Sequence, residues 1–132
     1  MKYFLILIII VGLVTLAFKT IINKSTSMQV SELKKLMEEQ PGVVIDVRTR
    51  DEHEQGHLAI TDALFDMLNG DFQRQIPHFD KNKTYYLYCR SGNRSGQAAM
   101  MMKRAGFENV FNIGGFDELV RAGFEPAKVE TP

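Results

Sequence analysis

Cys89 is the only cysteine of the chain and the residue best placed for covalent chemistry. It directly follows the strand-like stretch Thr84–Tyr88, and Gly92 soon after it allows the backbone to turn back. Such a turn can direct successive backbone N–H groups inward, and they form a concavity that binds anions. A helix expected to begin near Arg94 or Ser95 adds the positive end of its dipole.

Two arginines of the same segment, Arg90 and Arg94, add formal positive charge near Cys89. Together with the amides and the helix end, they favour the thiolate over the thiol, and the thiolate is the nucleophile. The same surroundings would hold a persulfide anion or an incoming sulfur–oxygen anion. Arg94 has a second interpretation, because it could instead form a structural ion pair with Asp46 or Glu52.

Short apolar stretches predict the strands that position this loop. The predicted strands are residues 43–45, 60–65, 84–88 and 110–113. The first predicted helix begins at Ser31 and ends before Pro41, and a single helical turn lies within 51–55. Further helices are predicted for 68–76, for the segment from the Cys89 loop to Gly106, and for 116–122. Helices alternating with apolar strands are typical of a parallel α/β sheet. In such a sheet, ligands bind where strands end and helices begin, which is the position of Cys89.

The chain resembles the rhodanese family from Val30 to about Phe124. The matching motifs are Ile45-Asp46-Val47-Arg48, Glu52 followed by Gly56-His57-Leu58, the loop from Cys89 to Ser95, and Gly114-Gly115. The resemblance implies an α/β fold with a five-stranded parallel sheet and helices on both faces. It also implies that Cys89 carries sulfur as a persulfide.

The resemblance assigns roles to the residues around Cys89. The residues it implies as walls of the substrate site are Arg90, Ser91, Gly92, Asn93 and Arg94. The residues it implies as supports of the loop are Asp46, Arg48 and Ser95.

A thiosulfate sulfurtransferase is the activity that the resemblance implies. The thiolate would attack the outer sulfur of thiosulfate, sulfite would leave, and cyanide or a thiol would then remove the sulfur. No metal or cofactor is needed for this reaction. A sulfur carrier that accepts persulfide sulfur from a partner protein would use the same cysteine.

Phosphatases and arsenate reductases are a third possibility, because they also hold an anion above a cysteine. Protein tyrosine phosphatases place five residues between the cysteine and the arginine that closes the loop. Here only four residues separate Cys89 from Arg94, and Ser95 occupies the next position. The loop length therefore favours sulfur transfer.

The N-terminal segment is uncharged from Tyr3 to Phe18, between Lys2 and Lys19. Its length suits either an uncleaved membrane anchor, with contacts to lipid through residues 3–22, or an export signal that is cleaved. We predict that residues 1–22 are this anchor or signal, that residues 23–29 are a polar tether, and that residues 30–132 form the domain. The protein would then lie in the cell envelope, anchored with an exported domain, or be periplasmic or secreted after cleavage.

Composition limits the other function classes. The chain has 132 residues, and its 16 basic and 16 acidic residues cancel. Nucleic-acid-binding proteins usually carry a basic excess, so we expect no nucleic-acid partner. One cysteine cannot make an intrachain disulfide or a cysteine-rich metal cluster. We expect one domain and a monomer.

Overall fold

The computed structural model describes the backbone of residues 1–128 and the side chains of residues 1, 3–11, 13 and 30–128. The chain divides into two compact units, Met1–Leu36 and Met37–Pro132. The second unit contains Cys89 and all the strands.

Helix α1 (Lys2–Glu39) forms the first unit and extends into the second. It includes residues 23–29, predicted as a tether, and it does not begin anew at Ser31. No glycine or proline occurs from residue 13 to residue 40, so nothing in this sequence interrupts the helix until Pro41-Gly42. The division into anchor, tether and domain stays a prediction.

The N-terminal part of α1 has exposed apolar side chains, which are more than half exposed from Tyr3 to Val11. Within the described residues, no helix has a stretch long and apolar enough to cross a bilayer. The predicted anchor falls in part on side chains outside the described residues.

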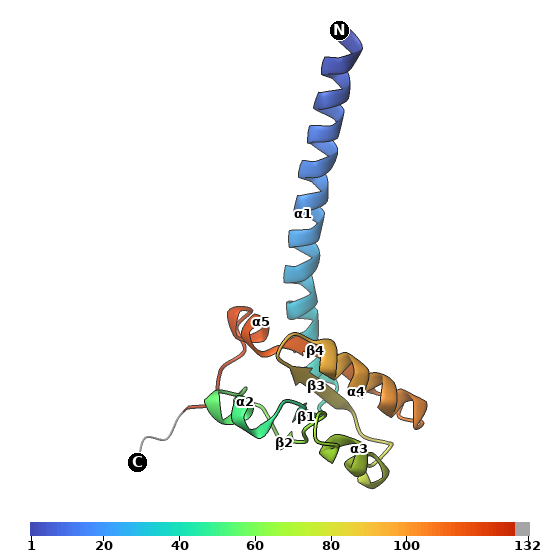
Figure 1. Cartoon of the computed structure of the whole chain (residues 1–132), viewed down its shortest axis with the longest axis vertical. Coiled ribbons are helices and arrows are strands. Elements are labelled where there is room, and N and C mark those ends of the chain that lie inside the picture. Colours follow the sequence, from blue (N-terminus) through green and yellow to red (C-terminus); the bar gives the residue numbers. More distant parts are fainter. Residues whose placement is uncertain (129–132) are drawn as a thin grey trace. The chain divides into compact units, whose positions relative to one another are not determined.

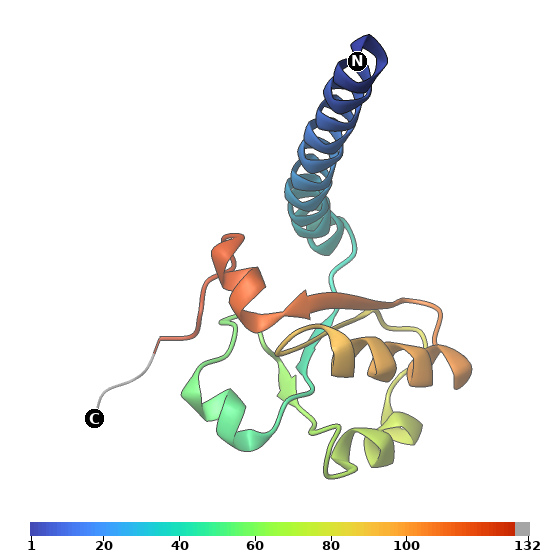
Figure 2. The same cartoon turned by 45° about the horizontal axis from the view of Figure 1, so that its top comes forward.

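The sheet in the described part of the chain has four parallel strands in the order β2-β1-β3-β4, which Figures 1 and 2 show from two directions. The strands are β1 (Val43–Asp46), β2 (Ala63–Leu64), β3 (Tyr85–Cys89) and β4 (Val110–Gly115). The expected count of five, which came from the resemblance, is therefore wrong for this part of the chain. The apolar stretches themselves predict these strands and no more.

β2 is shorter than the predicted strand 60–65. The residues before it turn, with the Thr61 N–H donating to the Leu58 carbonyl at 3.0 Å, and only Ala63 and Leu64 pair with β1.

The helices that follow the strands lie close to their predicted places. They are α2 (Arg50–Gln55), α3 (Asp71–Gln75), the 3₁₀ turn η1 (Ile76–His78), α4 (Asn93–Arg104) and α5 (Phe116–Arg121). α2 starts with a capping box, in which the side chains of Thr49 and Glu52 each accept from the other's backbone N–H. The predicted helix 68–76 is observed as α3 followed directly by η1, and Pro77 lies at the start of η1, where a missing N–H costs no helical hydrogen bond.

The core lies between β3 and the helices that cover one face of the sheet. Tyr85, Leu87 and Cys89 alternate along β3 and join one buried cluster, to which α4 contributes Ala98 and Met102. All five residues of β3 are buried. The strand that ends in Cys89 is thus held rigidly on both faces.

Candidate active site

Cys89 is the last residue of β3, and the loop after it leads into α4. Gly92 caps α4 with φ of 92°, a left-handed conformation that favours glycine. A side chain at Gly92 would also contact the backbone of Gly114 at 3.4 Å. The predicted strand, loop and helix are confirmed, with the helix beginning at Asn93.

The sulfur of Cys89 accepts hydrogen bonds from uncharged donors. The Gly92 N–H lies 3.1 Å from Sγ and the Ser95 hydroxyl 3.3 Å from it. Burial raises the pKa of the thiol, but the Ser95 hydroxyl and the amides of Ser95, Ser91 and Gly92 more than offset this, so the pKa lies below its ordinary value. The loop therefore favours the thiolate, as predicted.

Asn112 is a site residue that the sequence interpretation missed. Its Oδ1 lies 2.7 Å from the Ser95 hydroxyl and accepts the Gly114 N–H at 3.1 Å, while its Nδ2 donates to the Gly92 carbonyl at 2.9 Å. Because a hydroxyl has one proton, Ser95 can donate to Cys89 or to Asn112 but not to both at once. A polar residue inside the predicted apolar strand 110–113 was the available signal.

Arg94 forms a two-pronged ion pair with Glu52, with both N–O distances 2.8 Å. The hydrogen bond from Arg94 lowers the pKa of Glu52 to about 2. Of the two partners left open by the sequence, the structure selects Glu52 rather than Asp46. The pair joins α2 to the first turn of α4, and Glu52 neutralises much of the charge that Arg94 brings to the loop.

Asp46 and Arg48 form a buried pair at the end of β1, the strand next to β3. Asp46 accepts the Arg48 backbone N–H at 2.9 Å, and its other oxygen accepts from the guanidinium at 2.8 Å. The guanidinium also donates to the Gly56 carbonyl at 2.6 Å and lies over the Phe116 ring, 4.7 Å from its centroid. His53 Nδ1 lies 2.9 Å from Asp46. These contacts join the end of β1 to α2 and α5, and support of the Cys89 loop by Asp46 and Arg48 stays a prediction.

β4 approaches the loop closely through its last residue, Gly115, which pairs with Cys89 in the register of the two strands. A Cβ at Gly115 would overlap the Arg90 carbonyl and lie 3.0 Å from Ser91 Cα. Only glycine therefore lets β4 pack against the Cys89 loop.

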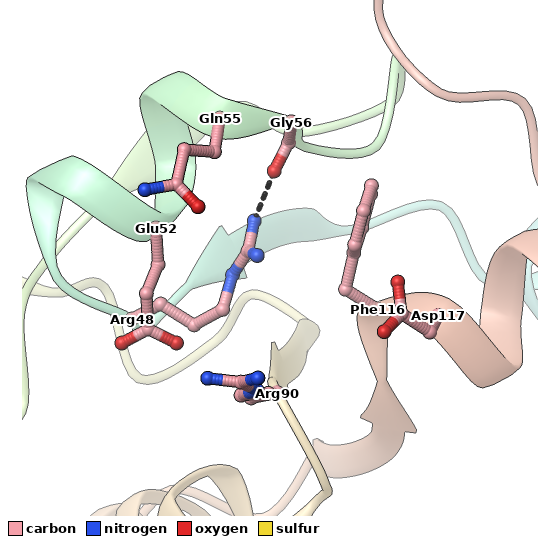
Figure 3. A pocket seen from close by; sticks show the side chains of 7 residues that line it. All are labelled: Arg48, Glu52, Gln55, Gly56, Arg90, Phe116 and Asp117. Carbon is pink, nitrogen blue, oxygen red and sulfur yellow. Dashed lines mark hydrogen bonds between the residues drawn. The ribbon is translucent and has the colours of Figure 1, made fainter.

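A pocket of about 220 Å³ borders the loop, with walls from α2, the residues after β1 and β3, and the start of α5 (Figure 3). Of the predicted substrate residues, only Arg90 lines it. Ser91 and Asn93 are exposed elsewhere on the loop. The Gly92 N–H donates to the sulfur, Arg94 pairs with Glu52, and the Ser95 hydroxyl lies 3.3 Å from the sulfur. The role of Ser95 as a support of the loop stays a prediction.

Comparison with solved structures supports the fold. A rhodanese from E. coli, solved with anions, superposes with a TM-score of 0.55 and 27% identity, covering 65% of this chain and 96% of that one. A rhodanese-like domain protein from Staphylococcus aureus superposes with a TM-score of 0.56 and 28% sequence identity, covering 73% of this chain and 88% of that one.

Curated relatives are longer than this chain. A tRNA uridine(34) hydroxylase from Sodalis glossinidius is 29% identical over 110 residues, which are 78% of this chain and 30% of that protein. YrkF of Bacillus subtilis, named as a candidate sulfur carrier protein, is 31% identical over 70 residues, or 53% of this chain and 36% of that protein. The chain thus spans about a third of the length of these relatives.

The family profile described as the rhodanese-like domain matches residues 29–122, which include every strand and the whole Cys89 loop. Together with the fold and the loop geometry, this match shows that the chain belongs to the rhodanese-like domain family.

Proposed function

We propose that this protein is a sulfurtransferase in which Cys89 carries a sulfane sulfur as a persulfide. One observation carries the proposal: the Gly92 amide donates to the buried sulfur and the Ser95 hydroxyl lies within donating distance of it, an environment that lowers the pKa of the thiol. A thiolate stabilised in this way is both a nucleophile and a good leaving group.

In the first half of the reaction, the Cys89 thiolate attacks the outer sulfur of thiosulfate. A sulfur–sulfur bond to Cys89 forms, the sulfur–sulfur bond of thiosulfate breaks, and sulfite leaves with the bonding electron pair. The negative charge of the thiolate is then on the outer sulfur of the persulfide, which can take a proton from water.

In the second half, an acceptor attacks the outer sulfur, and Cys89 leaves as a thiolate. The donors that lie near Sγ now stabilise the departing charge. Because the same hydrogen bonds assist attack and departure, the loop needs no separate general base.

Mass spectrometry of the intact protein tests the proposal directly. After incubation with thiosulfate, the full chain should gain about 32 Da, the mass of one sulfur atom, and cyanide should remove it as thiocyanate. The Cys89→Ser variant should gain nothing. A wild-type protein that takes up no sulfur from any persulfide or thiosulfate donor, or that hydrolyses an aryl phosphate instead, would refute the proposal.

A sulfur carrier is the second candidate, and the resemblance to the Bacillus subtilis protein favours it. A carrier would accept sulfur from a persulfidated partner protein and show little turnover with free thiosulfate. Steady-state thiocyanate production separates the two, because the enzyme turns over many times while the carrier releases at most one sulfur per chain. The hydroxylase activity of the longer relatives is not proposed for this chain.

We further propose that residues 1–22 attach the protein to the cell envelope, as an anchor or as a cleaved signal. The apolar sequence of this segment and the exposure of its side chains from Tyr3 to Val11 support this. Fractionation of cells, followed by N-terminal sequencing of the native protein, tests it. A cytoplasmic protein that starts at Met1 and does not sediment with membranes would contradict it. We also propose that the domain is a monomer.

A further inference from the structure

The pocket beside the Cys89 loop contains both paired and unpaired charges on its walls (Figure 3). Two of its charged side chains form ion pairs within the protein: Arg48 with the buried Asp46, and Glu52 with Arg94. Because these charges are neutralised by their partners, they contribute little net attraction for a ligand.

Arg90 and Asp117 are the remaining charged residues on the pocket wall, and both are exposed. Within the described part of the chain, neither takes part in an ion pair or a side-chain hydrogen bond. Arg90 follows Cys89 directly in the sequence, and Asp117 belongs to the first turn of α5. The pocket thus offers one cation and one anion, from two elements that meet at the loop.

The size of the pocket limits what it can hold. Its volume of about 220 Å³ is below the range of about 300–1,000 Å³ that is usual for drug-sized ligands. The ring of Phe116 supplies an apolar wall and Gln55 an uncharged amide. A ligand of amino-acid size, with a short aliphatic part and one charge of each sign, matches these features. A doubly negative ligand would be repelled by Asp117.

We propose that the acceptor of the sulfur is a small zwitterionic thiol of the amino-acid type, with its carboxylate at Arg90 and its ammonium group at Asp117. This inference rests on the proposed sulfurtransferase function. It places the acceptor next to Arg90, the residue that follows Cys89; Cys89 itself is buried and does not line the pocket.

The transfer step balances without a further reagent. The acceptor thiolate attacks the protonated outer sulfur of the Cys89 persulfide, and a new sulfur–sulfur bond forms. The bond between the outer sulfur and Sγ breaks, and Cys89 leaves with the electron pair as a thiolate. The product is the persulfide of the acceptor, which keeps the proton on its outer sulfur.

The test uses full-length protein that has first been loaded with sulfur and freed of thiosulfate, so that only the second half-reaction is observed. Four thiols that differ in charge serve as acceptors: cysteine, cysteamine, mercaptopropionate and β-mercaptoethanol. Loss of the added sulfur from the protein is followed by mass spectrometry. For each thiol, the rate with a variant is divided by the rate with the wild type, which removes the intrinsic reactivity of the thiol.

Arg90→Gln should slow the thiols that carry a carboxylate, cysteine and mercaptopropionate, by about three- to fivefold, the effect of about one exposed ion pair. Asp117→Asn should slow the thiols that carry an ammonium group, cysteine and cysteamine, by a similar factor. β-Mercaptoethanol should respond to neither variant. Arg121→Gln and Glu108→Gln, which remove exposed charges outside the pocket, should leave all ratios near one.

A uniform change across the four thiols in both variants, or no change in any of them, would overturn the inference. Failure to load sulfur on wild-type protein would instead count against the sulfurtransferase itself, so the two failures are distinguishable.

Discussion

Two arginine–carboxylate pairs lie beside the Cys89 loop, and they differ in burial. The side chains of Arg48 and Asp46 are 5% and 0% exposed, whereas those of Arg94 and Glu52 are 20% and 23% exposed. The buried pair also binds the Gly56 carbonyl and packs on an aromatic ring, while the other pair ties α2 to α4.

The comparison shows how the positive charge near Cys89 is used. Arg48 and Arg94 both face carboxylates, which neutralise much of their charge, whereas Arg90 has no ion-pair partner among the described residues. The donors to the sulfur are amides and a hydroxyl, which carry no formal charge. We infer that the buried pair stabilises the fold, that the more exposed pair modulates the loop, and that the uncharged donors ionise Cys89.

The largest effect is expected from breaking the buried pair. Arg48→Gln removes the guanidinium from the buried Asp46, which keeps only the backbone N–H of residue 48 and His53 Nδ1 among the partners described above, and should lower the free energy of unfolding by about 3–5 kcal/mol. Urea unfolding followed by tyrosine fluorescence measures this. Arg50→Gln is the matched control, because its pair with Glu54 is exposed and 3.9 Å long, and should change stability by less than about 0.5 kcal/mol. Equal effects of the two variants would remove the distinction between the pairs.

Removing an uncharged donor should have the largest effect on the thiol. Ser95→Ala deletes a hydroxyl that bonds to the sulfur, so the pKa of Cys89 should rise and alkylation by iodoacetamide at neutral pH should slow by about three- to tenfold. Ser91→Ala is the matched control, because the Ser91 amide remains in place. If Ser95→Ala left the pH profile of alkylation unchanged, the hydroxyl would have no part in ionising Cys89.

A smaller effect on the reactivity of Cys89 is expected when Arg94 loses its ion-pair partner. Glu52→Gln removes the carboxylate but keeps a residue that can complete the capping box of α2. The freed charge of Arg94 should lower the pKa of Cys89 and speed alkylation at neutral pH by about twofold. Glu54→Gln, on the same helix, should not. A slower reaction in Glu52→Gln would show that the ion pair itself keeps the loop in its reactive shape.

A further effect of similar size concerns acid stability. The pKa of Glu52 falls from 4.5 to about 2 in the folded protein, so its pair with Arg94 stabilises the fold above about pH 4.5 and loses this contribution as the pH falls toward 2. For a partly exposed pair, we expect about 1 kcal/mol or less. Urea unfolding of wild type and Glu52→Gln should differ most near neutral pH and converge at low pH. A constant difference would exclude this titration.

Local patterns in the sequence predicted the elements that carry the site. The apolar stretches at 43–45 and 84–88 correspond to strands, and the glycine after Cys89 marks the turn into α4. These features depend on neighbouring residues, so periodicity and composition are sufficient to find them. The prediction of a fifth strand was wrong because it came from family likeness, and no apolar stretch of the sequence corresponds to such a strand.

The side-chain partners could not be predicted in the same way. Arg94 and Glu52 are 42 positions apart, and only the folding of the chain brings α2 near the first turn of α4, where they meet. Both Asp46 and Glu52 were possible partners, and their distances from Arg94 depend on the turn of the chain after β1. Asn112 was missed because its role is visible only once β4 lies beside the Cys89 loop.

The pH dependence of thiolate absorbance in the ultraviolet tests the central claim most directly. It reports the ionisation of Cys89, the only cysteine, whether or not a reagent can reach it, once the tyrosine background of the Cys89→Ser variant is subtracted. The midpoint should lie at a lower pH in folded protein than in protein unfolded by urea. A folded-state midpoint equal to or above the unfolded one would contradict a loop built to hold the sulfur as an anion.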